Sequence, residues 1–275
     1  MKKIAEEILA SEGITEYGIL PIDEVQVFRP ELFSRGEPIT PKSLLLFLVP
    51  YYTGPAENLS LYAVSRDYHL YMQGLTARLI AALSASYPAA SFRAFSDHSP
   101  INERHAAARA GLGILGDNGL LINKAYGSLV FIGEIFSDLE APADAPLYPI
   151  VSCEHCGACH RACPTGALSG VGDCLSALTQ RKGELAEGPV VLMRDRKTVW
   201  GCDLCQTACP HTRRVIRENV LTPIAFFHEA RIPHLTGEIL AAMDASTFKT
   251  RAFSWRGRTT IARNLAAYER KNGGE

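Results

Sequence analysis

The distribution of hydrophobic residues divides the first half of the chain into helix-like and strand-like segments. Helical periodicity and alanine content predict helices over 1–12, Leu59–Tyr87 and Ile101–Ala110. Nearly continuous apolar runs rich in β-favouring residues predict strands over Ser43–Tyr52, Ser91–Ser96 and Ser128–Phe136. Because the two kinds of segment alternate, we expect an N-terminal α/β layer domain over residues 1–146. The Pro- and Ala-rich stretch Ala141–Pro149 is typical of a linker.

Composition narrows the class of protein. The chain has 275 residues, 47% hydrophobic and 21% charged, which excludes a disordered or collagen-like protein. No apolar run approaches the ~20 residues of a membrane span, and acids near the N-terminus argue against a signal peptide. We therefore expect a cytoplasmic protein without membrane contact. Residues His211–Glu275 carry 11 Lys and Arg against 6 Asp and Glu; this basic tail either attracts an anion such as nucleic acid or is an ordinary solvated helix surface.

Cysteine spacing carries the clearest chemical signal. All eight cysteines follow residue 152, and the first four form the run Cys153-x2-Cys156-x2-Cys159-x3-Cys163-Pro164. In this run three thiolates bind one [4Fe–4S] cubane, and the fourth, which precedes proline, binds another cluster. Zinc sites more often use two C-x2-C pairs separated by a longer loop. We therefore expect iron–sulfur clusters and not zinc, with no ligand role for His155 or His160.

A second group, Cys202-x2-Cys205-x3-Cys209-Pro210, repeats the pattern with one cysteine fewer. The same crossover rule assigns Cys209 to the first cluster. The predicted first cluster has the ligands Cys153, Cys156, Cys159 and Cys209. The predicted second cluster has the ligands Cys163, Cys174, Cys202 and Cys205, where Cys174 is the one cysteine left over. The fold class is thus a mixed α+β or α/β protein, with a two-cluster ferredoxin-like module over 147–215 and a short, basic helical tail over 216–275.

Two clusters alone transfer electrons, so we expect the upstream domain to hold the electron acceptor. Polar candidates for proton donation there are Asp97 with His98, and Asp67 with His69. For Asp97 the alternative is an N-cap of the helix that starts near residue 101.

The glycine pattern of Gly111-Leu-Gly-Ile-Leu-Gly116 matches G-x-G-x-x-G but follows a helix-like segment. A dinucleotide site needs a strand before the glycines and a helix after them. The sequence therefore predicts a glycine-rich turn whose backbone approaches a large ligand.

The sequence resembles the epoxyqueuosine reductase family, cobalamin-dependent iron–sulfur enzymes related to reductive dehalogenases. Besides the cysteine groups and the segment Cys174–Thr179, the matching stretches are Pro41–Tyr51, Ser65–His69, Asp97–Arg104, Ala110–Ile122, Tyr126–Ser128, Phe131–Glu134, Phe248–Arg251 and Arg263-Asn264. The resemblance implies base-off cobalamin in the N-terminal domain, fed with electrons by the two clusters. It implies reduction of epoxyqueuosine to queuosine in the tRNA anticodon loop.

The resemblance also implies roles for single residues. Asp97 falls on the family's general acid, which is expected to be buried so that it holds a proton near neutral pH. Contacts with the corrin are implied for Asn118, Tyr126, Ser128 and Asp203, with turn or capping duty as the alternative. Contacts with tRNA phosphates are implied for Arg213, Arg214, Arg256, Arg258 and Arg263. A low-potential donor such as a flavodoxin or ferredoxin would supply the electrons.

Two departures keep other functions open. His98 and Ser99 replace the small residues usual after the acid, and the sequence ends soon after Asn264, where many members continue into helical repeats. The alternatives are a corrinoid iron–sulfur reductase of another small molecule and a non-enzymatic electron-transfer protein.

The cysteine arithmetic makes a quantitative prediction. Protein reconstituted without oxygen is expected to bind about eight irons per chain, because two cubanes use all eight thiolates. Iron and zinc analysis of the desalted protein measures this, and stoichiometric zinc with little iron would contradict the assignment.

Overall fold

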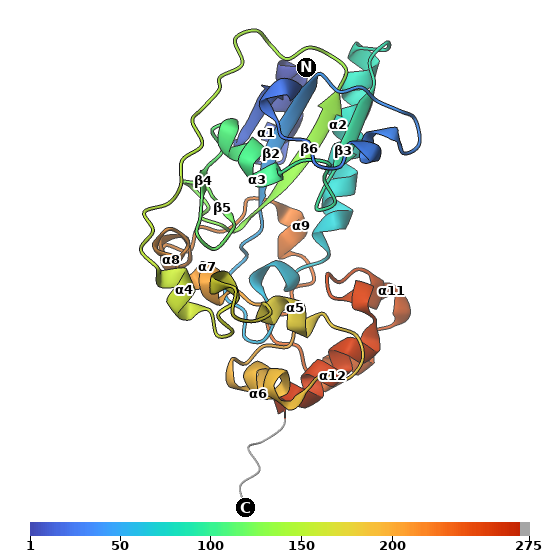
Figure 1. Ribbon diagram of the computed structural model, residues 1–275. Coiled ribbons are helices and arrows are strands. Elements are labelled where there is room, and N and C mark those ends of the chain that lie inside the picture. The colour runs from blue at the N-terminus through green and yellow to red at the C-terminus, as the bar shows by residue number, and fades with distance from the viewer. Residues whose placement is uncertain (270–275) are drawn as a thin grey trace, which may run out of the picture. The chain divides into compact units, whose positions relative to one another are not determined.

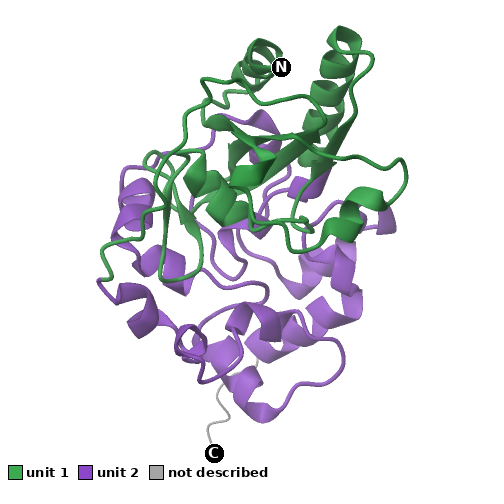
Figure 2. Ribbon diagram, turned by 45° about the horizontal axis from the view of Figure 1, so that its top comes forward, with its two compact units in different colours: residues 1–51, 71–155 green, residues 52–70, 156–275 purple. Residues whose placement is uncertain are grey.

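The computed structural model describes residues 1–269 and separates into two compact units (Figure 2). The first unit comprises Met1–Tyr51 and Tyr71–His155, and the second comprises Tyr52–Leu70 and the chain from Cys156 onward. The mixed α/β class expected from the sequence is confirmed. The functional division into 1–146, 147–215 and 216–275 stays a prediction, and residues 270–275 of the predicted tail lie outside the described residues.

The first unit is built on an antiparallel sheet with the strand order β1-β2-β6-β3. The strands are β1 (Tyr17–Pro21), β2 (Ser43–Pro50), β3 (Phe92–Phe95) and β6 (Val130–Ser137). The helices associated with it are α1 (Lys2–Ser11), α2 (Tyr68–Ser86) and α3 (Glu103–Arg109) (Figure 1).

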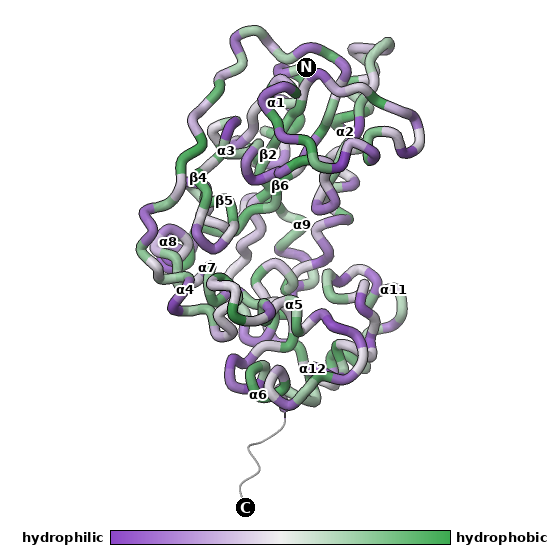
Figure 3. Tube along the Cα trace, viewed as in Figure 1, coloured by the Kyte–Doolittle hydropathy of each residue, from purple (hydrophilic) through white to green (hydrophobic). Residues whose placement is uncertain are grey.

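Strand β2 is the centre of this unit, and all eight of its residues are buried. Successive side chains of a strand point to opposite faces. Leu44, Leu46 and Leu48 accordingly pack in one apolar cluster with the alanines of α3. On the other face the ring of Phe47 lies against Gly133 of β6 and close to Met72 of α2. Both faces of the sheet therefore bury apolar side chains, which the hydropathy of β2 and β6 reflects (Figure 3).

One predicted helix is shorter than expected. The periodicity predicted a helix over Leu59–Tyr87, but α2 begins only at Tyr68. The preceding residues pair with distant parts of the second unit: the amide of Ser60 donates to the carbonyl of Trp200 (2.8 Å), and that of Asp67 donates to the carbonyl of Thr250 (2.7 Å). Local periodicity contains no information about these long-range hydrogen bonds.

The glycine-rich segment is a turn, as predicted. It forms a small hairpin of β4 (Ile114–Leu115) and β5 (Leu121–Ile122). A Cβ on Gly113 would lie 2.5 Å from the carbonyl oxygen of Ile122, so a side chain there would force the two strands apart.

The second unit consists largely of short helices around Trp200 and Phe253, which are fully buried. Its helices are α4 (Ala158–Ala162), α5 (Leu175–Thr179), α6 (Glu187–Asp195), α7 (Leu204–Ala208), α8 (Pro210–Arg217), α9 (Ala225–His228), α10 (Gly237–Ala242), α11 (Ala245–Lys249) and α12 (Arg258–Glu269). Across residues 1–269, no helix is both long and apolar enough to cross a membrane.

The contact between Gly133 and Phe47 generates a stability prediction. A Cβ at Gly133 would lie 2.3 Å from the Phe47 ring, so Gly133→Ala is expected to lower the free energy of unfolding by about 1–3 kcal/mol. The matched control is Gly74→Ala on the exposed side of α2, which is expected to gain about 0.5–1 kcal/mol from helix propensity. Thermal unfolding followed by circular dichroism measures both, and equal melting temperatures would refute the prediction.

Candidate functional site

Two short helices of the second unit present the cysteines in the same way. Helix α4 carries Cys159 and ends at Cys163, while α7 carries Cys205 and ends at Cys209. Proline follows each terminal cysteine and prevents the helix from continuing. The two helices contact each other, so the repeated sequence pattern corresponds to a repeated structural element.

The four thiols predicted for the second cluster are neighbours, together with Cys159 of the predicted first cluster. Cys174 and Cys163 disfavour a negative charge on Cys202, and Cys202, Cys174 and Cys159 disfavour one on Cys205. Burial, reinforced by Asp203 and by these thiols, raises the pKa of Cys202 to about 11 and that of Cys205 to about 12. Binding of a metal cluster must therefore displace protons from these groups.

The donor set fits iron–sulfur clusters. None of the eight cysteines forms a disulfide within the described chain, and Cys159 and Cys209 are buried. Thiolates are the ligands that these clusters prefer. The distribution of individual cysteines between the two clusters stays a prediction.

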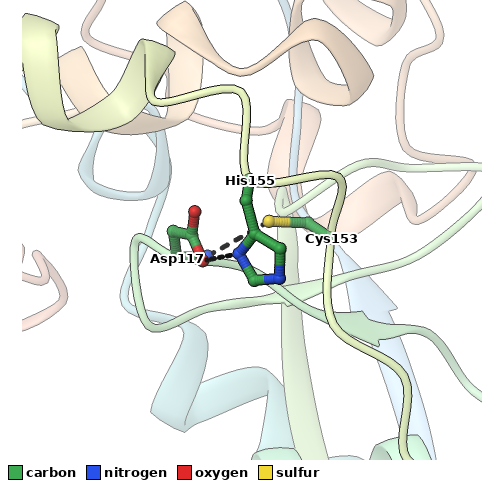
Figure 4. A group of neighbouring side chains, drawn as sticks. All are labelled: Asp117, Cys153 and His155. Atoms are coloured by element: carbon green, nitrogen blue, oxygen red, sulfur yellow. Dashed lines mark hydrogen bonds and ion pairs between the residues drawn. The ribbon is translucent and has the colours of Figure 1, made fainter.

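Cys153, predicted as a ligand of the first cluster, lies in a polar group with Asp117 and His155 (Figure 4). The amide of Asp117 donates to the Sγ of Cys153 at 3.4 Å, and the carboxylate of Asp117 pairs with Nδ1 of His155 at 2.7 Å. Hydrogen bonds to ligand sulfur tune the potential of a cluster. His155 thus has a partner other than a metal, and so has His160, which bonds the hydroxyl of Ser169.

Asp203 is held by the segment that precedes α2. Its carboxylate accepts hydrogen bonds from the Ser60 hydroxyl (2.6 Å) and the Leu61 amide (2.7 Å). Burial raises the pKa of Asp203, and these hydrogen bonds oppose the shift. The contacts supply the turn-stabilising role that was the alternative to corrin binding.

Asp97 lies in the turn between β3 and α3. It is exposed and has a left-handed backbone with φ of 67°. The N-cap of α3 is Asn102, whose side chain accepts from the His105 amide, so Asp97 does not perform the capping role considered for it. The burial expected for the general acid is absent from the described structure, where Asp97 projects at the surface of the first unit.

Two further acids lie close to this turn, and the sequence analysis missed them. Glu134 on β6 is fully buried, and its carboxylate accepts from the Ser99 hydroxyl at 2.6 Å. Burial and the neighbouring Glu103 raise the pKa of Glu134 well above its usual value. Burial and the charge on Asp97 raise the pKa of Glu103 to about 7. The sequence does contain a signal for Glu134, because this acid stands among the alternating positions Val130, Ile132, Glu134 and Phe136 of a strand, which are otherwise apolar.

The three remaining residues predicted to contact the corrin, Asn118, Tyr126 and Ser128, lie around the β4–β5 hairpin and the turn after it. The buried side chain of Asn123 accepts from the amides of Ala125 (2.8 Å) and Tyr126 (3.1 Å) and so shapes this turn. Ser128 is buried. The Nδ2 of Asn118 is also buried and finds no hydrogen-bond partner among residues 1–269, which leaves a donor for a ligand.

Comparison with known families defines the cysteine region. Residues 152–212 match the family model for a 4Fe-4S double cluster binding domain. The chain is therefore an iron–sulfur protein with a double [4Fe–4S] cluster-binding domain.

The relatives of the whole sequence are more specific. An epoxyqueuosine reductase of Lactococcus garvieae is 33% identical over 72% of this chain and 57% of its own length. That of Pseudomonas aeruginosa is 39% identical over 56% of this chain and 44% of its own length. The resemblance to the epoxyqueuosine reductases is confirmed, and the chain spans about half the length of the curated relatives it matches.

The fold agrees with solved structures. Epoxyqueuosine reductase from Streptococcus thermophilus has a TM-score of 0.74 and 23% identity, over 98% of this chain and 80% of that one. The Bacillus subtilis enzyme, described with its catalytic loop swung out of the active site, has a TM-score of 0.72 and 22% identity, over 97% and 81% of the two chains.

The assignment of Cys174 can be tested directly. Cys174→Ser is expected to reduce the iron content from about eight to about four per chain, because the second cubane loses a thiolate. The control is Ser176→Ala on α5, which is expected to retain full iron content. Iron analysis and electron paramagnetic resonance of the reduced protein measure the change; an unchanged pair of cluster signals would exclude Cys174 as a ligand.

Proposed function

We propose that the protein is an oxidoreductase that reduces epoxyqueuosine to queuosine in tRNA, using cobalamin and two [4Fe–4S] clusters. The proposal rests on one combined observation. The chain has a double-cluster domain and a turn that carries Asp97, and its sequence aligns with epoxyqueuosine reductases. The reaction breaks the two C–O bonds of the epoxide, consumes two electrons and two protons, and releases water.

The residues of the first unit fit a corrin with polar edges. The buried Nδ2 of Asn118, which has no hydrogen-bond partner in residues 1–269, offers a donor, and Tyr126 and Ser128 follow it in the chain by eight and ten residues. Burial, followed by the charge on Glu16, raises the pKa of Tyr126, so its hydroxyl remains a donor at neutral pH. The cobalt of bound cobalamin would supply the two-electron chemistry. Asp203 lies in the second unit, where its carboxylate accepts from Ser60 and Leu61, and we leave it out of this set.

Asp97 is the proposed proton donor. A leaving alkoxide is strongly basic, so a carboxylic acid beside it lowers the barrier to C–O cleavage. The exposed position of Asp97 corresponds in this proposal to a loop turned away from the substrate, like the swung-out catalytic loop described for the Bacillus subtilis enzyme. Closure of the turn would bury the acid and exclude water.

The proposed partner is the tRNA anticodon loop. A solved structure of an epoxyqueuosine reductase contains an epoxyqueuosine-modified tRNA stem loop. In this chain Arg213 is exposed on α8, and the guanidinium of Arg256 stacks on the exposed ring of Trp255 at 3.7 Å. These groups are suited to contacts with phosphates and bases.

The other three arginines of the predicted set have contacts within the second unit. Arg214 pairs with Glu218 (2.9 Å), Arg258 donates to the carbonyl of Met243 (2.7 Å), and Arg263 donates to the side chain of Asn264 (2.7 Å). We assign the main electrostatic contribution to Arg213 and Arg256. The proposed electron donor is a flavodoxin or ferredoxin, and the proposed location is the cytoplasm.

Asp97→Asn tests the catalytic role. Loss of the acidic proton is expected to lower the rate of queuosine formation by at least about 100-fold, while iron content and the optical shift on cobalamin binding stay unchanged. The assay is mass spectrometry of nucleosides from epoxyqueuosine-containing tRNA, with the exposed Asp144→Asn as the control.

Full activity of Asp97→Asn would remove Asp97 from the mechanism. Cobalamin binding by the native protein without any product in tRNA would instead favour reduction of another small molecule. Absence of a cobalamin shift would favour a simple electron carrier.

A further inference from the structure

The Asp97 turn rests on a buried polar group in an apolar layer. Ser99 lies two residues after Asp97 and is itself buried. Its hydroxyl donates to Oε2 of Glu134 and accepts from the amide of Ile101 at 3.2 Å. On the outer side, Arg29 donates to the carbonyl oxygen of Ser99 and pairs with Nδ1 of His98 at 3.0 Å. The turn is therefore held by the sheet on one side and by the loop that carries Arg29 on the other.

The position of Glu134 follows from strand geometry. Glu134 lies opposite Leu46 on β2 and Phe95 on β3. Directly opposed residues of antiparallel strands share a face, so Glu134 points into the same apolar cluster as Leu46, beneath the start of α3. Its second oxygen, Oε1, is buried and has no hydrogen-bond partner in residues 1–269. An ionised carboxylate in such surroundings is strongly disfavoured.

Glu103 is a second acid near Glu134 and Asp97. It is the first residue of α3, and both burial and the charge on Asp97 disfavour its ionised form. The charge on Glu103 in turn disfavours the ionised form of Glu134. The opposing cations are Arg104 on α3, which acts on Glu103, and Arg29, which acts on both glutamates. Glu103 and Glu134 therefore keep their protons to higher pH than an exposed glutamate does.

We propose that Glu134 and Ser99 are positioning residues for Asp97: the buried Glu134 carboxyl holds the Ser99 hydroxyl, and Ser99 holds the turn that carries Asp97. The inference rests on the proposed function. A neutral Glu134 carboxyl keeps this hydrogen bond without placing an unpaired charge in the apolar layer.

The first test does not depend on activity. Infrared spectra of the cluster-loaded protein are recorded from pH 5 to pH 9 in the carboxylic-acid carbonyl region. We expect a band at pH 7 that Glu134→Gln removes. The exposed Glu7→Gln on α1 serves as the control and leaves this band in place. Absence of an acid band sensitive to Glu134→Gln would overturn the inference, whatever the substrate proves to be.

The second test separates positioning from simple folding. Glu134→Ala and Ser99→Ala are expected to lower kcat about tenfold through misplacement of the turn, with little change in KM for tRNA. Glu134→Gln, which still accepts from Ser99, is expected to recover part of that loss.

Equal losses in Glu134→Ala and Glu134→Gln would contradict the inference. If native protein forms no queuosine at all, the proposed function fails, but the infrared result still decides whether the buried Glu134 holds its proton.

Discussion

In the second unit, burial of the cysteines disfavours the negative charge that they need to bind iron. Cluster iron needs thiolates, whereas the protein places Cys202 and Cys205 where burial holds their protons well above neutral pH. The metal must supply the free energy that removes these protons, so cluster binding and the final packing of the cysteine helices are coupled. This coupling explains how helices as short as α4 and α7, five residues each, hold reactive groups: isolated helices of that length are unstable in water.

In the first unit, burial disfavours the ionised form of a carboxyl group in the same way. Glu134 occupies an inward position in a strand whose other inward positions are Val130, Ile132 and Phe136. Burial of an acid there costs free energy, which its hydrogen bond with Ser99 offsets in part. This hydrogen bond links the centre of the sheet to the turn that carries Asp97, so a buried acid supports the residue proposed to donate a proton.

Much of the fold could be predicted because the informative patterns are local. The apolar run of β2, the alanines of α3 and the Cys-Pro pairs each specify their structure within a few residues. The start of α2 could not be predicted, since the amides of Ser60 and Asp67 bond to carbonyls more than 100 residues away. The hydrogen bonds of Asp203 and the placement of Glu134 under the Asp97 turn also join distant segments. Spacing identified the chemical groups, but only the folded chain identified their neighbours.

The left-handed backbone at residue 97 restricts which acid can stand there. Aspartate and asparagine tolerate a φ of 67° better than other residues with a side chain, because their short polar groups bond to the local backbone. Glutamate offers the same carboxyl group on a longer stem but lacks this tolerance. The position therefore constrains conformation and acidity together, and a change from one acid to the other would alter the shape of the turn before it altered the chemistry.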